Sequence, residues 1–252
     1  MGLPLSVWFC IPSKRPPDQV EPVLAKWKER GYKTALWRDD GWDMRWGFIA
    51  DRVCHGEYPG YAQAVNHLTK WILDYDPSCD WIVTGGDDIV PDTNGTAEEI
   101  SRECISYFSR VAHRKGEGDF STFGVMQPTG DRWGDSPRSR KEFGENRGAY
   151  IDRVCGSPWM GREFCQRIYG GKGPLWPEFT HMYVDEHLQC VAEKLGILWQ
   201  RRDLIQEHRH WGRTDSQQIP DHLKAVNTPA HFAESKAIFD RLKAGGFAEA
   251  SL

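Results

Sequence analysis

Two adjacent carboxylates follow a strongly apolar stretch of the sequence. Asp87 and Asp88 come directly after residues 80–84, which are typical of a buried strand, and after Gly85 and Gly86. Hard cations such as Mg²⁺ or Mn²⁺ take oxygen ligands from one or two carboxylates together with phosphate oxygens. Because ligands bind beyond the carboxyl ends of parallel strands, this position favours a divalent-metal site. The alternative is a solvated turn.

A second candidate for metal binding is the pair His208 and His210 within residues 207–211. In a strand the two side chains would point to the same face, and a neutral imidazole is a common ligand of divalent metals. Without a partner they are equally well explained as surface histidines. Asp88 offers that partner, so we predict a metal site of Asp88, His208 and His210, and leave open which histidine binds.

Asp185 and Glu186 stand at the start of a predicted helix, residues 185–195. An acidic residue in the first turn stabilises a helix by capping it or by opposing its dipole. The functional alternative makes Asp185 a general base that takes a proton from an acceptor hydroxyl.

Polar residues also follow the first two predicted strands. Ser13, Lys14 and Arg15 come after the first strand, and Asp39 comes after the second. Lysine and arginine could meet a diphosphate, and an aspartate could bind a nucleobase or ribose; ordinary loop polarity is the alternative. The sequence has no G-x-x-x-x-G-K-[ST], G-x-G-x-x-G or G-x-S-x-G pattern, so P-loop, dinucleotide-binding and nucleophile-elbow interpretations lose support.

Strand-like and helix-like segments alternate along the chain that must position these residues. We predict strands at 5–11, 32–37, 80–84 and 120–126, and helices at 22–30, 61–75, 96–111, 163–168, 185–195 and 230–242. The alternation predicts an α/β fold, with a mostly parallel sheet and helices on both faces. Residues 127–153 predict a long loop, and loops of that length often act as lids or binding segments. No linker divides the chain, which we therefore expect to be one domain.

Composition excludes several classes of protein. The chain has 252 residues, a net charge of -4, 12 tryptophans and 7 cysteines. No apolar run approaches the roughly 18 residues that span a bilayer, and the N-terminus lacks the features of a signal peptide, so we expect a cytoplasmic protein. The acidic balance disfavours a protein that coats nucleic acid, although a local basic groove stays open. The odd cysteine number without C-x-x-C predicts reduced, mostly buried thiols.

Taken in order, the clusters resemble the GT-A fold of nucleotide-sugar glycosyltransferases, especially family-2-like members. Residues 7–16 look like the first strand and its nucleotide-contacting loop, and residues 36–41 are similar to the second-strand aspartate motif. Residues 59–66 resemble a G-x-x-x-A-x-N helix start. Residues 86–91 look like the D-x-D region, but Gly86 replaces its first aspartate, which leaves Asp88 as the metal ligand.

The second half of the chain carries the rest of the resemblance, which spans residues 5–213. Residues 156–164 look like an acceptor-side loop, and residues 183–188 resemble the E-D-x-x-L type motif. In inverting enzymes the carboxylate of that motif is the base, here Asp185. His208 and His210 stand where many GT-A enzymes supply a late histidine to the metal.

The resemblance implies a GT-A type domain, residues 1–252, in a Rossmann-like arrangement. Residues 1–127 would bind the nucleotide sugar and residues 128–213 the acceptor, followed by a C-terminal tail, 214–252. The implied donor-binding residues are Pro12, Ser13, Lys14, Arg15, Asp39, Tyr61, Asn66, Gly86 and Asp87. The implied acceptor-binding residues are Arg132, Trp133, Trp159, Glu186 and Trp211.

The implied reaction moves a sugar from a nucleoside diphosphate, most simply a UDP-sugar, to an acceptor hydroxyl, with Mn²⁺ or Mg²⁺ as cofactor. Asp185 would act as the base with inversion, although retention stays open. Closure of residues 129–147 would exclude water, with Arg132 adding positive charge.

The acceptor is less constrained by the sequence. Aromatic side chains stack on sugars and nucleobases alike; the candidates are Trp133, Trp159, Trp176 and Trp211. A basic rim would suit nucleic acid, and its candidates are Arg132, Arg138, Arg140, Lys141, Arg147, Arg201, Arg202, Arg209 and Arg213. The compact chain is similar to bacteriophage glycosyltransferases that decorate hydroxymethylated DNA bases. A glycan or small-molecule acceptor, with a solvated charged face, fits as well.

Other classes of function use the same residue types. A nucleotidyltransferase of related α/β fold would release pyrophosphate, and a metal-dependent nuclease or phosphoesterase would hydrolyse a phosphodiester without a sugar donor. A nucleic-acid-binding module without catalysis would bind in a salt-sensitive way that chelators do not affect.

Overall fold

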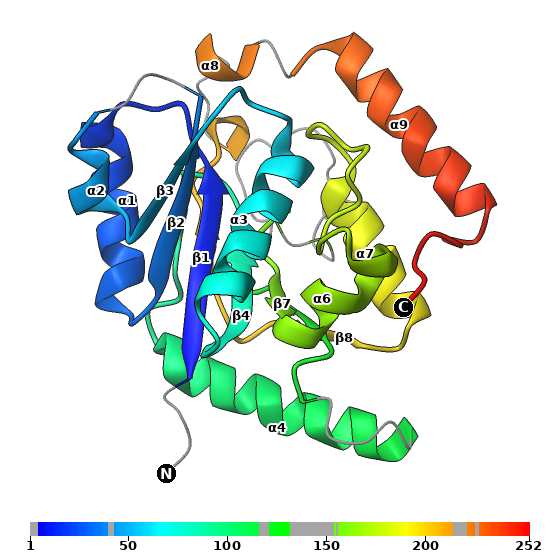
Figure 1. Ribbon diagram of the computed structural model, residues 1–252. Helices are drawn as coiled ribbons and strands as arrows, with labels where there is room; N and C mark the ends of the chain where they lie inside the picture. Colours follow the sequence, from blue (N-terminus) through cyan, green and yellow to red (C-terminus); the bar gives the residue numbers. More distant parts are fainter. Residues whose placement is uncertain are drawn as a thin grey trace.

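The structure is a computed structural model, and it describes residues 5–39, 43–115, 121–131, 154, 156–213, 221–224 and 227–252. Its centre is a sheet formed by β1 (Ser6–Pro12), β2 (Lys33–Arg38), β3 (Arg52–His55), β4 (Cys79–Thr84), β6 (Val125–Pro128), β7 (Trp159–Gly161) and β8 (Leu198–Arg201). The strand order is β3-β2-β1-β4-β7-β6-β8 (Figure 1). All neighbours are parallel except at β7, which runs antiparallel to β4 and β6. The prediction of a mostly parallel α/β sheet is confirmed.

Helices cover both faces of this sheet, as expected (Figure 1). On one face the apolar sides of α3 (Tyr61–Tyr75), α6 (Arg162–Gly171) and α7 (Val184–Lys194) form one core cluster with the sheet. On the other face α1 (Pro17–Glu29), α2 (Trp46–Ile49) and α4 (Ala97–Lys115) form a second cluster. The last long helix, α9 (Pro229–Ala244), packs against the first cluster through Phe239 and Leu242. Burial on both sides explains why β1 and β4 are continuous apolar runs.

Several predicted boundaries were wrong. Helix α1 begins at Pro17, five residues before the predicted start, because proline at the first helical position already has a helical φ angle. The strand predicted at 120–126 begins only at Val125. The sequence pattern also gave no signal for the short strands β3, β7 and β8, whose few residues cannot establish a periodicity.

A second, two-stranded sheet lies beside the carboxyl end of β4. It pairs β5 (Ile89–Val90) with β9 (Glu207–His208) in antiparallel fashion, so that Ile89 lies opposite His208. The buried carboxylate of Asp92 accepts a 2.7 Å hydrogen bond from the Ile205 backbone N–H. This small sheet brings residues more than one hundred positions apart in the sequence to one place.

No helix among the described residues is long and apolar enough to cross a bilayer. The six described cysteines are free thiols, most of them buried, and Cys155 lies outside the described residues.

Candidate active site

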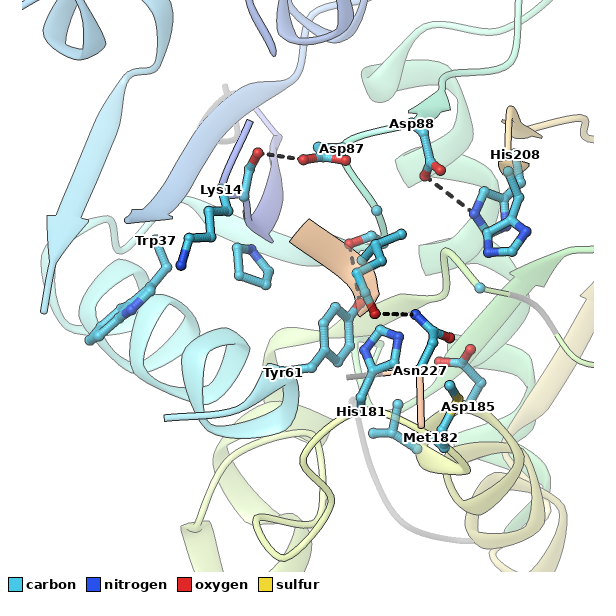
Figure 2. Close-up of a pocket in the computed structure, with 18 of the residues that line it drawn as sticks. Lys14, Trp37, Tyr61, Asp87, Asp88, His181, Met182, Asp185, His208 and Asn227 are labelled. Atoms are coloured by element: carbon cyan, nitrogen blue, oxygen red, sulfur yellow. Dashed lines mark hydrogen bonds and ion pairs between the residues drawn. The ribbon is translucent and has the colours of Figure 1, made fainter. Parts of the chain in front are cut away.

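A cavity of about 430 Å³ opens at the carboxyl ends of β1, β2 and β4 (Figure 2). Most of the residues singled out in the sequence line it together: Pro12, Ser13, Lys14, Arg15, Asp39, Tyr61, Gly86, Asp87, Asp88, Asp185, Glu186, His208 and His210. The strand-end rule therefore located the site, because parallel strands bring their following loops to one edge of the sheet.

A buried arginine holds the backbone of the loop that follows β1. Nη1 of Arg38, which is 1% exposed, donates 2.7 Å hydrogen bonds to the backbone oxygens of Ser13 and Arg15. The guanidinium of Arg38 also lies 4.1 Å from the ring centre of Trp46. These contacts fix the backbone that presents Lys14 and Arg15 to the cavity.

The side chains of this loop pair with carboxylates around the cavity. Nε of Arg15 lies 2.8 Å from Oδ1 of Asp87, and its Nη2 lies 3.7 Å from Oδ2 of Asp88. The Ser13 hydroxyl donates to the Asp87 carboxylate. Asp87 is therefore bound to the protein, whereas Lys14 is mostly exposed and forms only a 3.3 Å pair with Asp39.

Asp88 faces His208 across the small sheet. Oδ1 of Asp88 lies 3.2 Å from Nε2 of His208, and the carboxylate is only 11% exposed (Figure 2). A Cβ atom at Gly86 would lie 2.5 Å from that same Oδ1. The lack of a side chain at Gly86 thus leaves the space that the Asp88 carboxylate occupies.

The electrostatics of this pair favour an ionised Asp88. Burial alone would raise the pKa of Asp88, but the hydrogen bond and charge of His208, together with Arg15, hold it below its ordinary value. A cation at this position therefore meets an ionised carboxylate, and the proton that His208 donates to it must leave before the imidazole can bind the cation as well.

His210 lies next to His208 but has a different role in hydrogen bonding. Its Nδ1 accepts a 3.0 Å hydrogen bond from the backbone N–H of Gly212, which places the proton of the neutral ring on Nε2. Burial, with the charge of His208, lowers the pKa of His210 to about 4, so the ring is uncharged near neutral pH. Nε2 of either histidine has to lose its proton before it can bind a metal ion. His208 is the better placed of the two, because its Nε2 lies 3.2 Å from Oδ1 of Asp88.

The residues present fit a divalent cation that is completed by its substrate. Two ligand atoms that bind one ion at about 2.1 Å and at a near right angle are about 3 Å apart, which matches the 3.2 Å separation of Asp88 Oδ1 and His208 Nε2. In the described part of the chain, no three histidine, cysteine, aspartate or glutamate side chains form a ready-made metal site. Mg²⁺ sites likewise have few protein ligands, one or two carboxylates, and are completed by phosphate oxygens and water.

Asp185 and Glu186 line the same cavity, and Asp185 lies on the opposite side of it from Lys14 and Trp37 (Figure 2). Helix α7 begins at Val184, with Tyr183 as its N-cap in a left-handed conformation, so Asp185 is not the cap. It does lie in the first turn of the helix, where the simpler interpretation placed an acidic residue that opposes the helix dipole. Burial, with the nearby charge of Glu186, raises the pKa of Asp185 from 3.8 to about 8. A carboxyl group with a pKa near the working pH is suited to proton transfer.

Gly156 lies close to both His208 and Asp185. A Cβ atom placed on it would lie 3.7 Å from Nδ1 of His208 and 4.0 Å from Oδ2 of Asp185. The His208 ring and the Asp185 carboxylate thus both lie within 4.0 Å of one point beside Gly156, close enough to contact the same small ligand.

Sequence reasoning missed several residues that line the cavity: Trp37, Tyr58, His181, Met182, Leu223 and Asn227. Trp37 could have been found, because it lies at the polar end of the strand, one residue before Arg38 ends β2 and two before Asp39. His181 and Met182 lie just before Asp185 and could have been included with it. Leu223 and Asn227 gave no signal, since the resemblance ends at residue 213.

The structure places four predicted donor or stacking residues outside this cavity. The described candidates of the basic rim lie outside it as well: Arg201, Arg202, Arg209 and Arg213. Asn66 is buried, does not line this cavity, and forms two hydrogen bonds with the Leu175 backbone, of 2.7 and 3.0 Å, so the structure gives no support to its predicted role in donor binding. Trp211 packs on His210, with ring centres 5.0 Å apart, and Trp176 packs on Tyr169. The candidates of the long loop lie outside the described residues: Arg132, Trp133, Arg138, Arg140, Lys141 and Arg147.

Trp159 is the fourth, and it belongs to the core. It lies on β7, in the interior of the sheet, and is fully buried. Its Nε1–H donates a 2.7 Å hydrogen bond to Oε1 of Gln206. Because this ring is fully buried, the structure does not place it in the predicted contact with an acceptor. A count of tryptophans does not separate core rings from surface rings.

We expect Trp159→Phe to lower the free energy of unfolding by about 1–3 kcal/mol, because the buried Gln206 oxygen loses its donor. Urea unfolding followed by fluorescence measures this change. Catalytic activity at saturating substrate should stay within about twofold of the unchanged protein. Loss of activity without loss of stability would instead support the predicted contact of Trp159 with the acceptor.

Comparison with models of protein families and with curated proteins finds no match to this chain.

Proposed function

We propose that the protein is a metal-dependent glycosyltransferase of GT-A type, which moves a sugar from a nucleoside-diphosphate sugar to an acceptor hydroxyl. The observation that carries this proposal is a single cavity with three features. It has cationic side chains from the β1 loop, a carboxylate–imidazole pair suited to a dication, and a carboxyl group of raised pKa at the far side. These features match the order in which the sequence resembles glycosyltransferases.

The donor end of the cavity is the end with Lys14 and Trp37 (Figure 2), and Arg15 follows Lys14 in the same loop. Lys14 is free to swing toward a diphosphate, since it is 64% exposed and its pair with Asp39 is weak at the surface. Arg15 now neutralises Asp87 and Asp88. When a dication takes over Asp88, the guanidinium can turn to phosphate oxygens, for which arginine is well suited.

Asp88 and His208 would hold the metal ion. When bound, it would neutralise the negative charge that develops on the diphosphate leaving group. The hydrogen bond from the His208 backbone N–H to Asp131, at 2.6 Å, fixes the strand from which the imidazole extends. That support keeps the two ligand atoms in place before the ion arrives.

Asp185 would take the proton from the acceptor hydroxyl as its oxygen attacks C1 of the donor sugar. The bond from C1 to the diphosphate oxygen breaks, the new glycosidic bond forms, and the nucleoside diphosphate leaves. In the unligated protein the raised pKa of Asp185 makes its carboxylate a stronger base than an exposed aspartate. Attack from the side opposite the leaving group would invert the configuration at C1.

A thermal-shift screen of UDP, GDP and dTDP and their glucose conjugates, with and without Mn²⁺, tests this proposal. We expect at least one nucleotide to stabilise the protein only when Mn²⁺ or Mg²⁺ is present, by about 2.7 kcal/mol at a hundred times its Kd. Excess EDTA should abolish the shift, and long incubation should release nucleoside diphosphate from the matching sugar donor.

Three results would contradict the proposal. One is the absence of any metal-dependent nucleotide shift. The second is release of pyrophosphate, which would indicate nucleotidyl transfer. The third is cleavage of a phosphodiester without a sugar donor, which would indicate a nuclease.

A further inference from the structure

The chain beyond residue 213 completes the cavity. Leu223, on the short helix α8 (Asp221–Lys224), and Asn227 line the same space as Asp185 and Glu186. In Figure 2, Asn227 lies beside His181 and Asp185, and away from Lys14 and Trp37. The segment is therefore placed at the end of the cavity where the proposed base lies.

Hydrogen bonds fix the orientation of the Asn227 carboxamide. Its backbone N–H and its Nδ2 both donate to the carbonyl oxygen of Leu223, at 2.9 and 3.1 Å. Because a carbonyl oxygen only accepts, the amide nitrogen must be on that side. The Oδ1 atom is then directed the other way, toward Asp185 in Figure 2. The cavity is thereby given a hydrogen-bond acceptor next to the carboxyl group.

Helix α9 holds this arrangement in place. Thr228, the next residue after Asn227, caps α9 by accepting a 3.2 Å hydrogen bond from the backbone N–H of His231. Farther along α9, the rings of Phe232 and Phe239 lie 5.2 and 5.4 Å from the ring of Tyr183, the N-cap of α7. One helix thus supports both Asn227 and the start of the helix that carries Asp185.

Charge and polarity at this end disfavour a negatively charged ligand, since Asp185 and Glu186 are acidic. Met182, Tyr183 and Leu223 supply apolar surface, and burial, followed by the charge of His231, lowers the pKa of His181, which keeps that ring neutral. Among the described residues that line the cavity, the lysine and arginine side chains are those of the β1 loop, at the donor end.

We propose that the acceptor is an uncharged glycoside or polyol with two neighbouring hydroxyls; this inference rests on the proposed transferase function. The first hydroxyl gives its proton to the Asp185 carboxylate and forms the bond to C1 of the donor. The second keeps its proton and donates it in a hydrogen bond to Oδ1 of Asn227. A sugar ring also has an apolar C–H face, which can pack on Met182, Leu223 and the Tyr183 ring. Asn227 is a specificity-determining residue in this scheme.

The test measures transfer to methyl α- and β-glycosides of glucose, galactose and mannose, and to their monodeoxy analogues. The donor is the nucleotide sugar that gives the largest Mn²⁺-dependent thermal shift. We expect Asn227→Ala to raise the KM for the glycoside roughly tenfold, the effect of one lost hydrogen bond, while the KM for the donor changes by less than about twofold. Asn94→Ala, at an exposed asparagine outside the cavity, is the matched control.

A merely structural role of Asn227 would alter both KM values, and that result would overturn the inference. A second measurement needs no variant. In the unchanged protein, one deoxy analogue should have a KM raised about as much as Asn227→Ala raises it, and the variant should show no further loss with that analogue.

Donor binding separates the two proposals. If the donor binds with Mn²⁺ but no glycoside is an acceptor, or only a hydroxymethylated oligonucleotide is, the acceptor inference is overturned and the transferase proposal stands. If no nucleotide binds with Mn²⁺, both are overturned.

Discussion

Asp185→Asn should reduce kcat by about a hundredfold to ten-thousandfold, the contribution of a positioned general base. Asparagine keeps the shape of the side chain but cannot take a proton. Donor binding should persist, because Asp185 lies at the other end of the cavity from Lys14 and Arg15. The measurement is the initial rate of transfer at saturating donor, compared with the Mn²⁺-dependent nucleotide shift of the same protein.

The same variant should be more stable than the unchanged protein near pH 7. The pKa of Asp185 is about 8 in the folded chain and about 3.8 in an unfolded one. Between these values the unfolded state releases the proton and the folded state keeps it, so stability falls as the pH rises. Asparagine has no proton to release. A higher melting temperature together with lost activity would show that the loss is not due to unfolding.

The pH dependence of kcat/KM gives an independent check. A base must be deprotonated, so the rate should rise about tenfold per pH unit and level off near pH 8, the pKa of Asp185 in the free protein. Glu186→Gln is the control, since it removes a neighbouring carboxyl of the same cavity. Retention of activity in Asp185→Asn, with loss in Glu186→Gln, would transfer the role of base to Glu186.

The parts of the fold that could be predicted from sequence are those with a long repeating pattern. Helix α3 was predicted with its observed bounds, Tyr61–Tyr75, because its apolar residues recur at helical spacing over four turns. Strands β5 and β9 have two residues each and no pattern of their own. They exist because Asp92 and Trp27 bind the flanking backbone, at Ile205 and Ile89, and such contacts cannot be read from local sequence.

The residues of the candidate site also divide into those that the sequence pattern predicted and those that only the fold brings together. Asp87 and Asp88 were found because they follow a buried strand, and His208 because it could serve as their partner. Asn66 was assigned to the donor because of its place in a motif, yet its amide binds the Leu175 backbone. Nothing in the sequence distinguishes an amide that binds backbone from one that binds a ligand. Asn227 was missed for the converse reason, since only the fold brings it next to Asp185.

The second large effect should come from the carboxylate–imidazole pair. We expect Asp88→Ala to abolish Mn²⁺-dependent nucleotide binding and to lower kcat/KM by about a thousandfold, since a metal ion supplies several kcal/mol to the stabilisation of a leaving group. Isothermal titration with Mn²⁺ and the nucleoside diphosphate found in the screen measures the first effect. The Arg15 side chain, which pairs with both aspartates, would remain paired with Asp87 and keep the loop in place.

The two histidines give a matched comparison for the same experiment. His208→Ala should weaken Mn²⁺-dependent binding by at least the ten- to hundredfold that loss of even an outer-shell partner costs. His210→Ala should weaken it less, because Nε2 of His208 lies 3.2 Å from Oδ1 of Asp88, whereas Nδ1 of His210 accepts a hydrogen bond from the Gly212 backbone. His113→Ala, on the exposed side of α4, should have no effect. A larger loss in His210→Ala than in His208→Ala would mean that the ion binds on the other side of the imidazole pair, and that Asp88 and His208 form only an ion pair.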